Sequence, residues 1–518
     1  RAAAAAGPRS RGEARYVLCH EGSSQLPSAR LPGGRLAVFA ASVARRWNAG
    51  PVLRAALLWE SDARGWTPHL SSLDTGQPDR PFDGSVEAMD YPDAVRQTGI
   101  SREAFTSPRA RRDVIGRYAK CFGEPLPEGA RIGLRLGRRA GTLGVRGNGS
   151  WPVACGVQRF ANGELAHEFA QCGLPPGTAR GWGALGAGPP ARLHLELGAG
   201  LGAAGEGLQP LPLELCLVRR PLLNLSFCSM PLYGLRELQR ELPFALEDWL
   251  YYHLRVLGLD RGDVYDVDGS FAEALGPALL HRLLASGSLG YHGEWPAVLS
   301  AAMRELSAPH PSCSETWAYA HCLTTHRALS RWVVILHSPD EYLAAPEGPG
   351  RPGAALEAVE EAATWRPQDD WLPFMRLQAF SWGLSDPSGA EAEEAALRRG
   401  AVLAASGRRG KEPYPHTPVL DPGACVCTGP HGCYRSTSEG TYGGPMVDVP
   451  AGLLVVHHYV DMLRRDRGRC ARVPANGGCG VADGSMAWAV GLLAQAGPQA
   501  WEPWPPRGAP GPAEGGPS

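Results

Sequence analysis

The sequence predicts an α/β protein in two parts: a β-rich, sandwich-like domain over residues 31–215 and an α/β domain over residues 216–490. Three observations favour this division. Apolar runs of strand length, separated by clusters of Gly and Pro, fill the first part. Helical and strand-like patterns alternate in the second part, as they do in βαβ units. Two strand-like runs of the second part end in carboxylates, at the edge where the ligands of such sheets collect.

The two ends of the chain are expected to lie outside these domains. Residues 1–30 are rich in Ala, Arg, Gly and Ser, and residues 491–518 are rich in Pro and Gly. Segments with so few apolar residues cannot bury enough surface to offset the entropy lost on ordering. We therefore expect a disordered N-terminal segment and a low-complexity tail.

Within the first domain, five runs are expected to form strands, because each is continuously apolar or alternates between apolar and polar residues. They are "RLAVFAASV" (35–43), "PVLRAALLWE" (51–60), "ARIGLRLG" (130–137), "PVACGVQRFA" (152–161) and "ARLHLELG" (191–198).

The second domain is expected to alternate helices with strands. The spacing of apolar residues predicts helices over 242–259, 271–287 and 315–330 and strands over 263–270, 331–336 and 453–460. Because strands joined by helices run parallel, we expect a mainly parallel sheet whose carboxyl ends share one edge.

The overall composition argues against some classes of function. The 518 residues include 51 basic and 52 acidic side chains, so the net charge of −1 provides no field that would attract nucleic acid. Only two of the basic residues are lysines, a bias that we attribute to a GC-rich genome. No apolar stretch reaches the ~18 residues of a membrane-spanning helix, and the first residues lack the apolar core of a signal peptide. We expect a fragment, with any membrane anchor preceding this segment.

Cysteines and glycosylation signals favour a secretory protein. The chain has 13 cysteines and two Asn-x-Ser sequons, at Asn148 and Asn224. In "CVCTGPHGC" (425–433), a zinc site is conceivable, formed by Cys425, Cys427, Cys433 and His431. The C-x-C spacing is tighter than zinc sites usually have, and disulfides are the commoner outcome in a secretory chain.

Two carboxylates end the strand-like run over 263–270. Asp266 and Asp268 can accept hydrogen bonds from the ribose or base of a nucleoside, and Gly269 lets the chain turn closely around such a ligand. The alternative is a plain acidic turn, because Asp and Gly are favoured turn residues.

A second pair, Asp340 and Glu341, follows the strand over 331–336. Mn²⁺ and Mg²⁺ prefer such oxygen ligands, and a cation there would neutralise the diphosphate leaving group of a nucleotide sugar. The alternative is a solvated strand end. His457 or His458 would complete the site; adjacent strand residues point to opposite faces, so at most one faces it, and a lone strand histidine is more often structural.

Five segments of the chain share an order and spacing that is more telling than any one motif. They are "CSMPLYG" (228–234), "EDWLYYHLRVLGLDRGDVYDVDGS" (247–270), "AYAHCLTTHRALSRWVVILHSPDEYL" (318–343), "GKEPYPHTPVL" (410–420) and "VVHHYV" (455–460). Together they resemble glycosyltransferase family 92, which includes plant β-1,4-galactan synthases and animal galactosyltransferases. The string "SPDEY" is similar to the family's Asp-x-Asp-Glu motif, but Ser338 stands where the first aspartate is expected.

The resemblance implies a GT-A type fold, a nucleotide-sugar-binding mixed sheet flanked by helices. It implies a Golgi-lumenal, type II membrane protein that transfers a hexose with inversion, galactose from UDP-galactose, to a glycan acceptor. It places nucleotide-sugar contacts at Tyr233, Asp266, Asp268, Ser338, Asp340 and Glu341, and metal ligands at Asp340, His457 and His458. Mn²⁺ is the implied cofactor, although Ser338 brings no charge to hold it. The alternative is a catalytically degenerate relative of the same fold that binds glycans.

Overall fold

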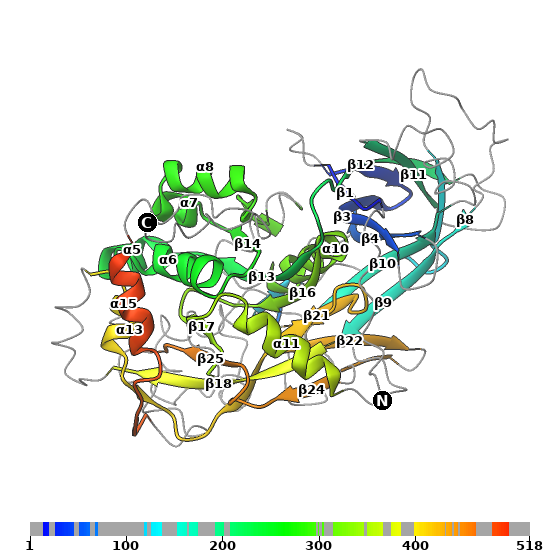
Figure 1. Cartoon of the computed structure of the whole chain (residues 1–518). Coiled ribbons are helices and arrows are strands. Elements are labelled where there is room, and N and C mark those ends of the chain that lie inside the picture. Colours follow the sequence, from blue (N-terminus) through cyan, green and yellow to red (C-terminus); the bar gives the residue numbers. More distant parts are fainter. Residues whose placement is uncertain are drawn as a thin grey trace, which may run out of the picture.

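The structure is a computed structural model of the chain (Figure 1). It describes residues 14–19, 26–45, 51–62, 68–70, 119–121, 126–136, 153–162, 165–174, 192–200, 208–296, 299, 303–304, 314–346, 350–365, 374–384, 398–429, 431–437, 440–443, 446–460, 462 and 479–496. Residues 491–495 do not belong to the low-complexity tail expected over 491–518, because they continue helix α15 (Ala487–Gln495), whose Leu493 is buried; the residues from 497 onward lie outside those that the structure describes.

The N-terminal part is a single antiparallel sheet that closes on itself. Its strand order is β8-β7-β11-β12-β1-β3-β4-β10-β9, with β2 paired to β3. The two ends of this order are joined, because only Cys155 separates β8 from β9 in the chain. Strand β8 pairs with β7, and β9 pairs with β10. The closed sheet encloses its own apolar core. The N-terminal part is therefore a single closed sheet and not the sandwich of two sheets expected from the sequence.

The strands of this closed sheet have the following bounds: β1 Tyr16–Leu18, β2 Ser28–Leu31, β3 Gly34–Arg45, β4 Pro51–Ser61, β7 Arg131–Leu136, β8 Val153–Ala154, β9 Gly156–Asn162, β10 Leu165–Gly173, β11 Arg192–Gly200 and β12 Gln209–Leu217. Two further strands, β5 Pro68–Leu70 and β6 Ala119–Cys121, pair with each other.

The expectation of disorder over residues 1–30 is wrong for the part that the structure describes. Strand β1 lies between β12 and β3, and β2 pairs with β3. A disulfide joins Cys19, just after β1, to Cys216 in β12. Three residues are too short a run to be recognised as a strand, but two neighbouring strands satisfy their backbone groups.

The C-terminal part has a mixed sheet rather than the mainly parallel sheet expected. Strands β15, β14, β13 and β16 are mutually parallel, whereas β20 runs antiparallel to both β16 and β18. Strands β24 and β25 run parallel to β18, and β17 runs antiparallel to β25. The chain is therefore α/β with mostly β content.

The strands of the mixed sheet are β13 Leu223–Leu232, β14 Arg261–Asp266, β15 Leu289–His292, β16 Ser330–Ile335, β17 Glu341–Ala344, β18 Phe374–Gly383, β19 Arg408–Arg409, β20 Tyr414–Leu420, β24 Met446–Val449, β25 Val455–His458 and β26 Val481–Ala482. A separate small sheet contains β21 Cys427–Gly429, β22 Gly432–Thr437 and β23 Gly440–Gly443.

The described helices all belong to the C-terminal part. They are α5 Leu235–Glu241, α6 Ala245–Tyr251 with a π-helical continuation over Tyr252–Val256, α7 Ser270–Leu275, α8 Pro277–Ser286, α10 Glu315–Leu329, α11 Ala354–Thr364, α13 Ala401–Ala405 and α15 Ala487–Gln495. Among the residues described, no helix is both long and apolar enough to cross a membrane.

Helix α10 lies between the closed sheet and the mixed sheet (Figure 1). Almost all of its side chains are buried, and Phe39 of β3 packs edge-on against its Trp317 at 5.3 Å between ring centroids. One apolar cluster contains residues of both sheets and of α10, so the two domains share a core. A disulfide between Cys228 and Cys322 fixes α10 to β13.

Two buried arginines also connect the domains. Arg54 of β4 donates hydrogen bonds to the carbonyls of Pro422, Cys425 and Gly423 at 2.8, 3.1 and 3.2 Å. Arg327 of α10 donates in the opposite direction, to carbonyls of β3 and β4. These contacts hold the N-terminal sheet against the sheet that carries the candidate site.

Candidate functional site

The topology of the mixed sheet marks one edge as the candidate binding site. After β13 the chain forms β14 and β15 on one side, then returns through α10 to β16 on the other side. The strand order therefore reverses between β13 and β16. In open α/β sheets, ligands bind beyond the carboxyl ends of the strands at such a point. Here the two ends are in contact, because the Met230 amide donates to the His337 carbonyl at 3.1 Å.

The turn after β16 explains why a proline lies in this segment. The Glu341 amide donates to the Ser338 carbonyl at 3.1 Å, which closes a four-residue turn. Pro339 occupies its second position, where a fixed φ suits the turn. The turn brings Ser338 and Asp340 together, and the Ser338 hydroxyl donates to Oδ1 of Asp340.

Asp340 pairs with a histidine from β25. Its Oδ2 lies 3.3 Å from Nε2 of His458, whose Nδ1 is 2.9 Å from the Tyr414 hydroxyl on β20. Burial alone would lower the pKa of His458, but Tyr414 and Asp340 oppose this effect and raise that pKa to about 10. Burial would raise the pKa of Asp340, but His458 holds it below its usual value. The pair is therefore ionised at neutral pH.

A second group of side chains forms around Glu341, which begins β17. Its Oε1 lies 2.7 Å from Nδ1 of His337 and 2.8 Å from Nε2 of His416 on β20. Its Oε2 accepts the His337 amide at 2.9 Å. Burial would raise the pKa of Glu341, but the two histidines hold it well below its usual value. The rings of His416 and His458 stack at 5.2 Å, so the Glu341 and Asp340 groups are contiguous.

The structure does not bring His457 to this site. In the register of β17 and β25, His458 pairs with Glu341 and His457 pairs with Tyr342. Directly opposed residues face the same side of a sheet, so His457 lies on the other face. There its ring packs on Trp382 at 4.7 Å, and burial lowers its pKa to about 3. The assignment of His457 as a ligand beside Asp340 is therefore corrected.

Asp266 and Asp268 lie at the neighbouring strand end. Asp266 ends β14, and its Oδ2 accepts hydrogen bonds from the Tyr291 hydroxyl at 2.9 Å and the Ala272 amide at 3.2 Å. Its Oδ1 is buried without a partner among the described residues. Burial raises the pKa of this carboxyl despite those hydrogen bonds.

Asp268 has a structural task. Its Oδ2 accepts the Gly234 amide at 3.1 Å, and its Oδ1 accepts the Ser270 amide at 3.0 Å. Gly269, which lies between Asp268 and Ser270 in the sequence, has φ +75°, a backbone conformation that suits glycine. Asp268 thereby holds the half-buried Tyr233 and the end of β13 beside β14.

The predicted residues thus form two groups on one sheet edge, not one. Strand β13 separates the Asp266 group from the Asp340 group, which corresponds to about 10 Å between strands β14 and β16. Sequence reasoning missed His337 and His416 as members of the site. His337 is adjacent to the motif and was a visible candidate, but only the pairing of β20 brings His416 to Glu341, 75 residues away.

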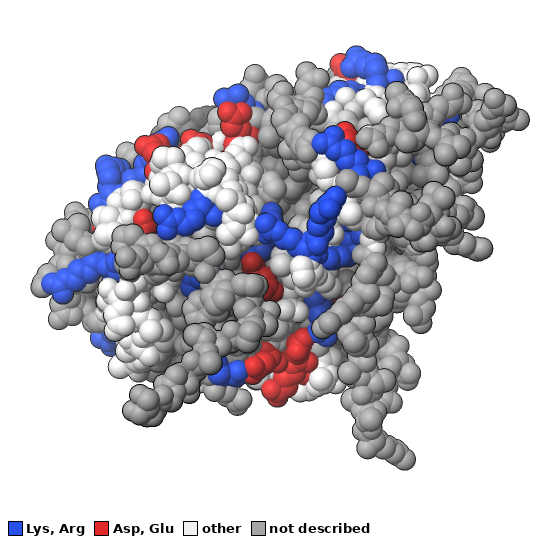
Figure 2. Space-filling view, turned by 45° about the horizontal axis from the view of Figure 1, so that its top comes forward, with Lys and Arg blue, Asp and Glu red and all other residues white. Residues whose placement is uncertain are grey.

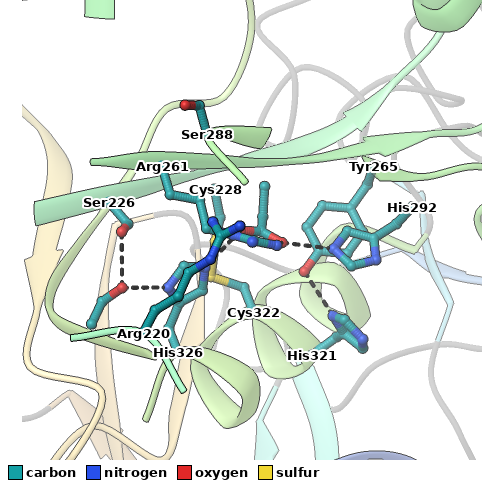
Figure 3. Close-up of polar contacts among 12 residues, drawn as sticks. Arg220, Ser226, Cys228, Arg261, Tyr265, Ser288, His292, His321, Cys322 and His326 are labelled. Carbon is teal, nitrogen blue, oxygen red and sulfur yellow. Dashed lines mark hydrogen bonds and ion pairs between the residues drawn. A yellow bond between two sulfur atoms is a disulfide. The ribbon is translucent and has the colours of Figure 1, made fainter. Parts of the chain in front are cut away.

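A separate buried polar network surrounds Asp263 of β14, whose partners Arg261, His292 and His326 are labelled in Figure 3. Ser330 Oγ lies 2.7 Å from Nδ1 of His326, whose Nε2 lies 2.9 Å from Oδ2 of Asp263. These are the residue types of a hydrolase triad. However, their exposure is 0%, 0% and 1%, so no substrate can reach the hydroxyl. Ser330 instead shares a hydrogen bond with Ser226, and the network is structural.

The zinc interpretation of the cysteine-rich segment is also resolved by the structure. Cys425 and Cys433 form a disulfide, as was favoured from the sequence, and Cys427 is a buried free thiol. A disulfide also joins Cys155 to Cys172. The chain matches no known family model, and comparison with curated proteins and with solved structures finds no match either.

Proposed function

We propose that this chain is a glycosyltransferase that transfers a hexose with inversion, galactose from UDP-galactose, to a glycan acceptor. The observation that carries the proposal is the position of Asp340 and His458 at the point where the strand order reverses. This is the edge at which α/β sheets bind nucleotides. The resemblance of the segments around these residues to glycosyltransferase family 92 supplies the reaction class and the sugar.

The Asp266 side of the edge would bind the nucleoside. The buried Oδ1 of Asp266 lacks a partner among the described residues and can accept a hydrogen bond from a ribose hydroxyl or a uracil N–H. Both oxygens of Asp268 already accept hydrogen bonds from backbone amides. The main role of Asp268 would therefore be to position Tyr233, and any contact of Asp268 with the ligand would be additional.

The Asp340 side would face the diphosphate. Oδ2 of Asp340 and Nε2 of His458 are 3.3 Å apart, close to the ~3.0 Å between neighbouring ligands of an octahedral cation with bonds of about 2.1 Å. Once Nε2 of His458 releases its proton, the two residues would fit Mn²⁺, which would neutralise charge on the leaving diphosphate when bound. Ser338 donates to Asp340 and keeps its carboxylate oriented toward His458.

The charge and the cysteines of the protein agree with this proposal. On the face shown in Figure 2, the described basic and acidic side chains occur in small separate groups, and the net charge of the whole chain is −1, which does not favour nucleic acid as the partner. The disulfides fit an oxidising compartment such as the Golgi lumen.

Calorimetric titration of UDP, with and without Mn²⁺, tests the proposal, followed by transfer assays with UDP-galactose and a panel of glycans. We expect UDP binding that Mn²⁺ strengthens and that Asp340→Asn weakens. The variant Glu357→Gln, which alters an exposed ion pair on α11, is the matched control. Absence of both transfer and donor hydrolysis with every UDP-sugar would refute the enzymatic proposal.

A second candidate, a non-catalytic glycan-binding protein, is favoured by one observation. With Ser338 in the place of an aspartate, Asp340 is the one carboxylate that forms an ion pair with His458 among the residues that the structure describes, and a single carboxylate weakens a hard-cation site. Glycan binding without any UDP binding would support this second function.

A further inference from the structure

We infer that His337, Glu341 and His416 form a binding site for a divalent transition metal, with Zn²⁺ as the preferred ion, separate from the Asp340–His458 pair. The three side chains each offer one ligand atom, and these atoms lie within 4.8 Å of one another. The inference does not depend on the proposed glycosyl transfer.

The type of ligand selects the metal. Two imidazoles and one carboxylate are the protein ligands of many catalytic zinc sites, whereas Mg²⁺ and Ca²⁺ prefer oxygen ligands alone. Imidazole also binds Fe²⁺, Ni²⁺ and Cu²⁺, so metal availability contributes to the choice. Cys427 is the one free cysteine among the described residues and is not part of the group.

The geometry needs only a small adjustment. The two ring nitrogens lie 2.7 and 2.8 Å from Oε1 of Glu341, as they do when each shares a proton with that oxygen. Ligands of tetrahedral zinc at about 2.0–2.1 Å are separated by about 3.3 Å, so each pair must move apart by roughly 0.5 Å. As the metal enters, a neutral imidazole would move its ring proton to the nitrogen that does not bind the metal, and a protonated imidazole would release one proton to the solvent; no oxidation or reduction takes place.

Surrounding groups already hold the ligands in place. The His337 amide binds Oε2 of Glu341, and the Trp249 indole N–H donates to the Glu341 carbonyl at 2.9 Å. Nδ1 of His431 lies 2.8 Å from the His416 carbonyl. Such outer contacts fix ligand orientation in metal sites.

Zinc titration of the chelator-treated full chain, against a competing chromophoric chelator and without nucleotide, tests the inference. We expect one equivalent of zinc for the wild type. His416→Ala and Glu341→Gln should weaken binding at least about 100-fold, because each removes a direct ligand. His281→Ala, which removes an exposed histidine on α8, and Asp340→Asn should retain the affinity.

Binding of Co²⁺ to the wild type provides a second measurement that needs no variant. We expect the d–d absorption of a low-coordinate site without a thiolate charge-transfer band. The inference would be overturned if the wild type did not bind zinc, or if His416→Ala and His281→Ala bound zinc with equal affinity. A thiolate band in the Co²⁺ spectrum would also overturn it. Because no UDP is present, these outcomes leave the proposed transfer activity to its own test.

Discussion

Replacing Asp263 by asparagine would measure the contribution of the buried network to stability. The side chain is 2% exposed and accepts hydrogen bonds from Arg261 at 2.6 and 3.0 Å, from His292 at 3.0 Å and from His326 at 2.9 Å. Burial alone would raise the pKa of Asp263, but Arg261 and His326 hold it well below its usual value. The carboxylate is therefore charged in the folded protein.

Asparagine keeps the shape of the side chain but removes its charge. It retains one acceptor oxygen, while its amide group is a donor that faces other donors. Removing one partner of a buried ion pair costs about 3–5 kcal/mol, because the other charge stays buried without compensation. We expect a value near the lower end, about 3 kcal/mol, because the remaining oxygen still accepts from some of these donors.

The pair between Arg351 and Glu357 on α11 is the matched control. It is also held by two arginine–carboxylate hydrogen bonds, each of 2.6 Å, but its side chains are 54% and 61% exposed. Glu357→Gln should leave the midpoint of urea unfolding unchanged, because solvent screens such pairs. The assay is urea denaturation of both variants beside the wild type, with the slope checked for constancy. Equal midpoints for the two variants would refute the reasoning.

Three other predictions concern the domain interface and the sequon. Burial lowers the pKa of His167, which packs on α10, to about 3, so its contribution to stability is complete above pH ~6.5 and is lost as the pH falls toward 3. His167→Phe should therefore flatten the pH dependence of urea unfolding between pH 7 and 4; an unchanged slope would contradict this. Arg54→Ala leaves three buried carbonyls without their donor and should lower the free energy of unfolding by about 2–4 kcal/mol. Arg30→Ala, which removes an exposed arginine, should have little effect. Similar losses of stability in both variants would show that the hydrogen bonds of Arg54 do not stabilise the domain interface. Asn224 should be unmodified in peptide maps of protein from a glycosylating host, because Ser226 of its sequon is 0% exposed within β13; a glycan at Asn224 would mean that modification precedes folding.

The local elements were largely predictable from periodicity. The strand expected over 331–336 is β16, Ser330–Ile335, and the helix expected over 315–330 is α10, Glu315–Leu329. The helix expected over 242–259 was right in position, but it begins at Ala245 and changes to a π-helix at Tyr252. Apolar spacing reports which side is buried, and it does not report the hydrogen-bond pattern within the helix.

Long-range pairing was not predictable, and the site depends on it. The carboxylates at strand ends were found because strand ends and turns have local signatures. His416 became visible as a partner of Glu341 only with the antiparallel placement of β20 next to β16, which no local pattern encodes. Strand β1 was missed because it has only three residues and because its pairing with β12 spans up to 201 residues, as between Tyr16 and Leu217.

The position of α10 between the two sheets also has a consequence during synthesis. Trp317 follows Phe39, its contact on β3, by 278 residues. At about 5–20 residues per second, a ribosome needs roughly 15–55 s to cover that distance. During this interval the outer apolar face of β3 and β4 is exposed to the solvent. We therefore expect the nascent N-terminal domain, whose last strand β12 ends at Leu217, to need chaperones until α10 emerges, and we expect substitutions in α10 to reduce its yield.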